Sequence, residues 1–196
     1  MTGAGARRPR VYLAGPEVFH PQAAALGRAK AALAAEFGLE GLFPLDEAVC
    51  GDGLTPGQHG LAIYRADIAM MDRCDAIVAN LTPFRGPHAD PGTAFELGYM
   101  RAQGKPCLAY SAAPGALADR VAPGADDPTR DAEGYAIEDF AMADNLMLAG
   151  AVFDADGGAI EAPPSASGDD PFWDFRALRA SLARAAAILA DRPRGP

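Results

Sequence analysis

One segment in the middle of the chain limits the fold most, because two strand patterns flank a helix pattern there. Residues 75–80, Asp-Ala-Ile-Val-Ala-Asn, form a short apolar run that is typical of a buried strand. Asp90-Pro91-Gly92 combines a capping side chain with a proline suited to the first helical position, which predicts a helix over residues 91–104. Residues 105–110 form the next strand pattern. Strands joined through a helix pair in parallel by a right-handed crossover, so the segment predicts an α/β fold.

The same alternation continues on both sides of this segment. Strand patterns occupy residues 11–15 and 42–45, and helix patterns occupy residues 21–37, 61–74 and 172–190. Polar stretches rich in glycine and proline, at 48–57, 111–134 and 157–170, separate them as loops. We therefore expect one α/β domain over residues 11–196 after a flexible N-terminus of residues 1–10. Its fold class is a single open, mostly parallel sheet flanked by helices, flavodoxin-like or Rossmann-like.

Within the helix at 61–74, the pattern makes Ile63, Ala66, Met70 and Met71 the expected inner face.

Composition excludes several classes of partner. The formal net charge of −9 disfavours a nucleic-acid polymer or an anionic membrane surface, since either would require clustered lysine and arginine. The three cysteines contain no Cys-x-x-Cys pair and the three histidines lack ligand spacing, so we expect no disulfide framework and no metal site. Without a secretory leader pattern or a membrane-spanning apolar run, the expected location is cytoplasmic.

Carboxylates dominate the polar groups expected at the ligand-binding edge of the sheet. Ligands of open parallel sheets bind beyond the carboxyl ends of the strands, which here brings together residues 15–19, 46–47, 80–90 and the segment from 111 onward. No glycine-rich phosphate loop accompanies them. Glu96 lies among apolar neighbours one and a half turns into its helix. It is either an ordinary solvated helix residue or one of the paired carboxylates that suit cleavage of a glycosidic bond.

Several motifs together resemble the nucleoside 2-deoxyribosyltransferase family over about residues 11–151. The specific part is residues 90–99, Asp-Pro-Gly-Thr-Ala-Phe-Glu-Leu-Gly-Tyr, and the match extends to residues 11–16, Asp67, residues 75–83 and residues 144–147. The resemblance implies a flavodoxin-like sheet and a two-step exchange without a cofactor or metal. A glutamate attacks C1′ of a 2′-deoxynucleoside and expels the base, and a second purine or pyrimidine base then attacks the deoxyribosyl ester with overall retention.

The resemblance also implies the catalytic roles. Glu96 matches the family nucleophile, and Tyr12 would orient it through its hydroxyl. Asp67 and Asp90 match two supporting aspartates. We assign proton transfer to and from the base to Asp67, with Asp90 as a competitor that would otherwise bind a sugar hydroxyl; Asp72, in the same helix as Asp67, is a rival. An N-cap for Asp90, a solvated helix position for Asp67 and a core position for Tyr12 are the structural alternatives.

The remaining expected site residues would bind substrate. Asn145 matches a family asparagine that reaches into the neighbouring subunit's site to hold the 5′-hydroxyl, which implies a homo-oligomer with a shared active site. Phe19 and Met147 would form apolar walls around the base, and Gly15 and Gly92 would lie against the substrate. A helix cap for Asn145 and plain core positions for Phe19 and Met147 are their structural alternatives.

Two other functions fit the same residues. A hydrolase of this fold passes deoxyribose to water, often from a 5′-monophosphate, whose phosphate would need serine, arginine or backbone amides near the first loop. Glu17 stands in that loop and Arg85 is the nearest candidate base, which favours unphosphorylated substrates. A non-catalytic nucleotide-sensing module is the second alternative. Residues 46–50 offer no amide to read the base, so the base preference stays open.

Overall fold

The computed structural model describes residues 7–47, 49–165, 168 and 170–192. A four-stranded parallel sheet has the order β2-β1-β3-β4, formed by β1 (Arg10–Ala14), β2 (Glu40–Leu42), β3 (Ala76–Asn80) and β4 (Cys107–Tyr110). The strand order reverses between β1 and β3, which is the switch point where ligands of flavodoxin-like sheets bind. The predicted fold class is therefore confirmed.

The start of the chain is only partly described. Residues 1–6 of the expected flexible N-terminus lie outside the described residues. Arg10 already belongs to β1, and the Arg7 guanidinium forms an ion pair with Asp75 at 3.1 Å.

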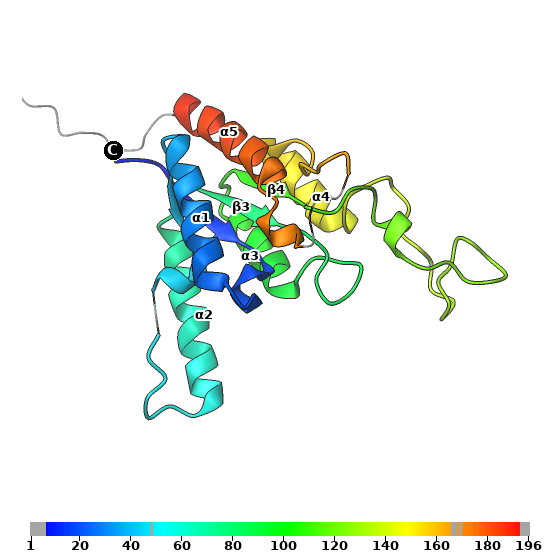
Figure 1. Cartoon of the computed structure of the whole chain (residues 1–196), viewed down its shortest axis with the longest axis horizontal. Helices are drawn as coiled ribbons and strands as arrows, with labels where there is room; N and C mark the ends of the chain where they lie inside the picture. Colours follow the sequence, from blue (N-terminus) through cyan, green and yellow to red (C-terminus); the bar gives the residue numbers. More distant parts are fainter. Residues whose placement is uncertain (1–6, 48, 166–167, 169, 193–196) are drawn as a thin grey trace, which may run out of the picture.

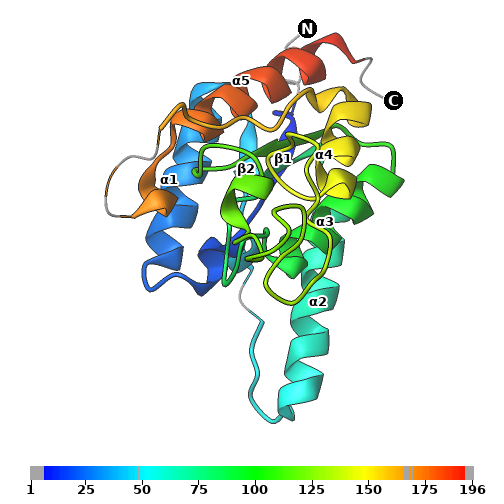
Figure 2. The same cartoon turned by 90° about the vertical axis from the view of Figure 1, so that its right-hand side faces the viewer.

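Helices cover both faces of the sheet (Figure 1, Figure 2). One apolar cluster joins α1 (Ala23–Glu36) and α5 (Arg176–Asp191) to one face of the strands. The other joins α2 (Pro56–Asp72), α3 (Pro91–Ala102) and α4 (Leu146–Val152) to the opposite face. Alternation along β1 sends Val11 and Leu13 into the first cluster and Tyr12 into the second, so Tyr12 lies on the face covered by α2, α3 and α4.

Two predicted boundaries were wrong because local hydrogen bonds override the apolar pattern. The second strand ends at Leu42, and residues 44–46 form a 3-10 turn in which Asp46 Oδ2 accepts from the Phe43 amide at 2.7 Å. Helix α2 begins at Pro56, five residues earlier than predicted. A capping box causes this early start, since the Gln58 amide donates to Thr55 Oγ1 and the Thr55 amide donates to Gln58 Oε1.

Helix α2 is poorly covered by the rest of the chain. Its N-terminal half projects from the body (Figure 1), and only Met70 and Met71 of its residues are buried. The expected inner position of Ile63 was therefore wrong, because its side chain is 42% exposed. The closing helix also starts later than predicted, at Arg176, after a short 3-10 turn at Pro171–Trp173.

The long loop after β4 contains a 3-10 turn at Ala118–Arg120. Arg120 donates to the carbonyl oxygens of Pro87 and Ala116, which ties the start of this loop to the segment before α3. The chain beyond Arg120 extends away from the sheet (Figure 1). Within the described residues, no helix is both long enough and apolar enough to cross a lipid bilayer.

Candidate active site

A short hydrogen bond between Tyr12 and Glu96 forms the centre of the site. Tyr12 is fully buried on β1, and its hydroxyl donates to Glu96 Oε1 at 2.6 Å. Glu96 is carried by α3, whose first turn is closed by Asp90 and Pro91 as the sequence predicted. The sheet and the helix capping therefore place a carboxylate from α3 against a strand residue 84 positions away.

The surroundings of Glu96 hold its pKa near neutrality. Burial raises the pKa of Glu96 to about 7, the negative charges of Asp67 and Asp90 add to that rise, and the Tyr12 hydrogen bond opposes it. Burial and the Glu96 charge raise the pKa of Tyr12 far above its ordinary value, so its hydroxyl stays protonated as the donor. Glu96 can therefore ionise near pH 7 while it keeps the basicity of a good nucleophile.

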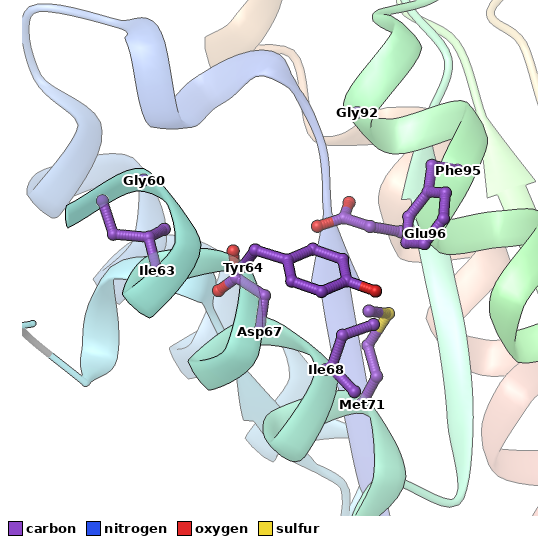
Figure 3. A pocket seen from close by; sticks show the side chains of 9 residues that line it. All are labelled: Gly60, Ile63, Tyr64, Asp67, Ile68, Met71, Gly92, Phe95 and Glu96. Atoms are coloured by element: carbon purple, nitrogen blue, oxygen red, sulfur yellow. The ribbon is translucent and has the colours of Figure 1, made fainter. Parts of the chain in front are cut away.

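A cavity of about 250 Å³ between α2 and α3 opens onto this carboxylate. Glu96 extends from α3 toward α2, and Asp67 and the ring of Tyr64 reach in from α2 (Figure 3). Burial raises the pKa of Asp67 to about 6, so a fraction of this side chain is protonated near neutral pH. The nine lining residues are Gly60, Ile63, Tyr64, Asp67, Ile68, Met71, Gly92, Phe95 and Glu96.

The structure separates the three candidate aspartates. Asp67 lines the cavity, whereas Asp72 accepts hydrogen bonds from the Tyr99 hydroxyl and the Gln103 amide, both at 2.7 Å, and is not a lining residue. Asp90 is buried and accepts from the Thr93 amide at 3.0 Å as the cap of α3. It is not a lining residue of the cavity, and its negative charge raises the pKa of Glu96.

The loop after β1 contributes less to the cavity than expected. Gly15 closes β1 where a Cβ atom would lie 2.0 Å from Glu17 Oε2, so the position admits only glycine. The Phe19 ring stacks on Phe84 with centroids 5.4 Å apart, and the Arg85 guanidinium lies 5.2 Å from the Phe19 centroid. Gly92 lines the cavity, but Gly15 and Phe19 do not.

Asn145 and Met147 also lie outside the cavity of their own chain. Asn145 caps α4, where its Oδ1 accepts from the Met147 amide at 3.0 Å and its Nδ2 donates to Glu138 at 2.8 Å. Met147 is 71% exposed. Helix α4 packs on α3, so both residues are presented beside the helix that carries Glu96 rather than inside its cavity.

A buried charge network next to the site was not foreseen. Glu17 Oε1 accepts from Lys30 Nζ at 2.9 Å, from Asn80 Nδ2 at 2.8 Å and from the Tyr110 hydroxyl at 3.1 Å. Both charged side chains are fully buried, and Glu17 Oε2 has no hydrogen-bond partner among the described residues. The network ties the turn after β1 to the ends of β3 and β4.

A sequence signal for Lys30 did exist. It lies four residues after Leu26 and three before Leu33, both of them buried positions on α1.

The described part of the chain contains no group of three or more histidine, cysteine or acidic side chains positioned to hold a metal ion. What the cavity does bring together is an ionisable carboxylate on one wall and a carboxyl group with a raised pKa on the other. That pair can attack an electrophilic carbon and supply a proton to its leaving group.

Comparisons with known proteins point to one family. A family model described as "Nucleoside 2-deoxyribosyltransferase" matches residues 11–147. The structure of a 2-desoxiribosyltransferase from Leishmania mexicana is similar at 35% identity with a TM-score of 0.58, covering 71% of this chain and 85% of that one. An uncharacterized protein of Schizosaccharomyces pombe is 35% identical over an alignment of 160 residues, and the match covers 72% of this chain and 76% of that protein.

A conserved protein from Enterococcus faecalis V583 shares the fold, with a TM-score of 0.55 at 19% identity over 91% of this chain and 99% of that one. The sequence motifs, the parallel sheet and the matched length agree, and the chain belongs to the nucleoside 2-deoxyribosyltransferase family.

Proposed function

We propose that this protein transfers the 2-deoxyribosyl group between nucleobases by a retaining double displacement through a glutamyl ester of Glu96. The observation that carries the proposal is the 2.6 Å hydrogen bond from Tyr12 to Glu96, with Asp67 on the facing wall of the same cavity. Family membership supports cleavage of an N-glycosidic bond as the general activity. The substrates are a 2′-deoxynucleoside and a free purine or pyrimidine base.

Side chains of the cavity account for every bond and proton in the two steps of the transfer. The Glu96 carboxylate attacks C1′, the bond from C1′ to the base nitrogen breaks, and the base leaves with the electron pair and takes a proton from Asp67. The incoming base then attacks C1′ and gives its N–H proton to Asp67, while the ester bond breaks and restores the Glu96 carboxylate. Two displacements on one carbon produce net retention.

Tyr12 and Asp90 support this chemistry without exchanging groups with the substrate. The Tyr12 hydroxyl fixes the carboxylate of Glu96 and stabilises its ionised form. Asp90 holds the first turn of α3, which sets the position of Glu96. We retain a sugar hydroxyl as a second ligand of Asp90, alongside its role as a cap.

A shared site is the second part of the proposal. Asn145 and Met147 do not line the cavity of their own chain, and large apolar side chains are exposed on all three helices of this face: Leu61 on α2, Phe95 on α3 and Met147 on α4, each at least 50% exposed. Apolar exposure of this extent favours an interface. We propose a homo-oligomer in which Asn145 of one subunit binds the sugar in the cavity of another.

Mixing inactive variants tests the shared site. Glu96→Gln and Asn145→Ala should each be inactive alone, and co-refolded mixtures should recover up to about a quarter of the wild-type activity if a dimer forms at random, because one cavity of each mixed dimer is intact. Light scattering should show a dimer or larger. An active monomer would refute the shared role of Asn145.

The reaction itself is tested by incubation with deoxyinosine, with and without adenine, followed by chromatography. Adenine-dependent formation of deoxyadenosine is the expected result, and Glu96→Ala should abolish it while the far-UV circular dichroism stays unchanged. Free hypoxanthine without a new nucleoside would identify a hydrolase instead. We place the activity in cytoplasmic salvage of deoxyribonucleosides, with no nucleic-acid polymer and no membrane as a partner.

A further inference from the structure

The cavity beside Glu96 has an aromatic wall that the proposed mechanism leaves without a role. Tyr64 of α2 and Phe95 of α3 both line the cavity, with ring centroids 6.1 Å apart and ring planes tilted by 56°. Both side chains are 50% exposed, so neither serves the packed core of the chain. Figure 3 shows the ring of Tyr64 reaching across from α2 toward α3, in the cavity that Glu96 also lines.

The positions of the two rings follow from those of the two carboxylates. Tyr64 lies three residues before Asp67, so both side chains project from the same face of α2. Phe95 immediately precedes Glu96 and stacks on Tyr99 with centroids 6.2 Å apart. The Tyr99 hydroxyl donates to Asp72, and this hydrogen bond fixes the ring on which Phe95 stacks.

This geometry assigns a position to each half of a nucleoside. The sugar carbon must lie at Glu96, and the base must lie at Asp67, which exchanges a proton with it. The group next to Asp67 is therefore flat and aromatic, and the ring of Tyr64 projects from the same helix into the same cavity. Apart from the two carboxylates, the cavity lining offers one side-chain polar group, the Tyr64 hydroxyl, which bonds to no other residue in the part of the chain that the structure describes.

We propose that Tyr64 is a base-contacting residue that sets base preference: the nucleobase stacks on its ring, with Phe95 closing the wall, and purines gain more from this contact than pyrimidines. The inference rests on the proposed function, because it places the sugar at Glu96. It differs from the expectation that Phe19 and Met147 flank the base, since neither residue lines the cavity. Stacking of a base on an aromatic side chain changes affinity by on the order of tenfold.

The test compares Tyr64→Leu with Tyr64→Phe, and uses Tyr135→Leu as a matched control, since Tyr135 is a 73% exposed tyrosine outside the cavity. Tyr64→Leu should raise the KM for deoxyinosine on the order of tenfold with kcat changed less than about threefold, and should raise the KM for thymidine less. Tyr64→Phe should keep most of the wild-type KM, because the ring remains. Tyr135→Leu should match the wild type.

A binding measurement separates this inference from the proposed reaction. Calorimetric titration with adenine alone, on Glu96→Gln and on Glu96→Gln/Tyr64→Leu, needs no turnover and should show on the order of tenfold weaker binding in the double variant. That result supports the base contact even if the wild type fails to transfer deoxyribose. Equal adenine affinity in the two variants would overturn the inference. So would a change of oligomeric state in Tyr64→Leu with unchanged adenine affinity, which would assign the ring to a subunit interface.

Discussion

Replacing Glu96 with glutamine should stabilise the protein at alkaline pH while it destroys the activity. The pKa of Glu96 is about 7 in the folded chain against 4.5 for an unperturbed glutamate, chiefly because of burial. Ionising it therefore costs about 3 kcal/mol more in the folded state than in the unfolded state. Glutamine keeps the shape and still accepts the Tyr12 hydrogen bond, but it carries no charge to bury.

The sign and the pH window follow from that raised pKa. Below pH 4.5 the carboxyl group is protonated in both states and costs nothing. Between pH 4.5 and 7 the unfolded chain releases the proton first, so the folded state loses stability, and above pH 7 the loss is complete. The advantage of Glu96→Gln should therefore grow from near zero at pH 4.5 to about 3 kcal/mol at pH 8. For a chain of this length that is a rise in Tm of roughly 6–12 °C.

Thermal unfolding followed by circular dichroism from pH 4.5 to 8.5 measures this difference directly. Glu133→Gln, which removes a carboxylate from an exposed loop, is the control and should leave the pH dependence of Tm unchanged. A Glu96→Gln variant whose Tm exceeds that of the wild type by the same amount at every pH would show that charge burial is not the cause. A variant less stable than the wild type at pH 8 would refute the reasoning altogether.

Three further predictions concern the neighbours of Glu96. The transfer rate should follow a bell-shaped pH profile with its maximum between about pH 6 and 7, because Glu96 must be ionised and Asp67 protonated. The Asp67→Asn variant should lose the alkaline limb of this profile, because asparagine does not titrate. Lys30→Met should lower stability by about 3–5 kcal/mol in denaturant titrations, and Glu17→Gln/Lys30→Met should recover most of that, because no buried charge remains unpaired. Asp90→Ala should cost about 1 kcal/mol by the loss of the α3 cap, and a chemical-denaturation midpoint equal to that of Asp90→Asn would contradict this.

The candidate active site gathers several acidic groups from elements that are far apart in the chain. The Tyr12 hydroxyl reaches Glu96 from the buried strand β1, and two helices that both pack on the same face of the sheet supply the carboxylates. Burial raises the pKa of both carboxyl groups, so holding the proposed nucleophile and proton donor in this cavity lowers the stability of the folded chain near neutral pH. The Glu96→Gln experiment measures that cost in one residue.

Patterns within short stretches of sequence determined the fold class and the local features. The apolar run that forms β3, the cap and proline that start α3, and the alternation along β1 all report interactions between residues close in the chain. The resemblance of residues 90–99 to a family motif, rather than a local interaction, marked Glu96 as the candidate nucleophile. The predicted start of α2 was wrong because a capping box at Thr55 competed with the apolar pattern.

Only the tertiary structure decided which of these groups meet. Asp67 and Asp72 lie in one helix and are alike in sequence, but the placement of α2 and α3 on two sides of one cavity puts Asp67 in its lining and Asp72 beside Tyr99. The same arrangement leaves Ile63 exposed and brings Tyr64 to the cavity that Glu96 also lines. The physical reason is the distance along the chain over which each interaction acts. Periodicity within a helix or strand decides which side of that element a side chain lies on, whereas the contacts of a cavity depend on how separate elements pack across the sheet.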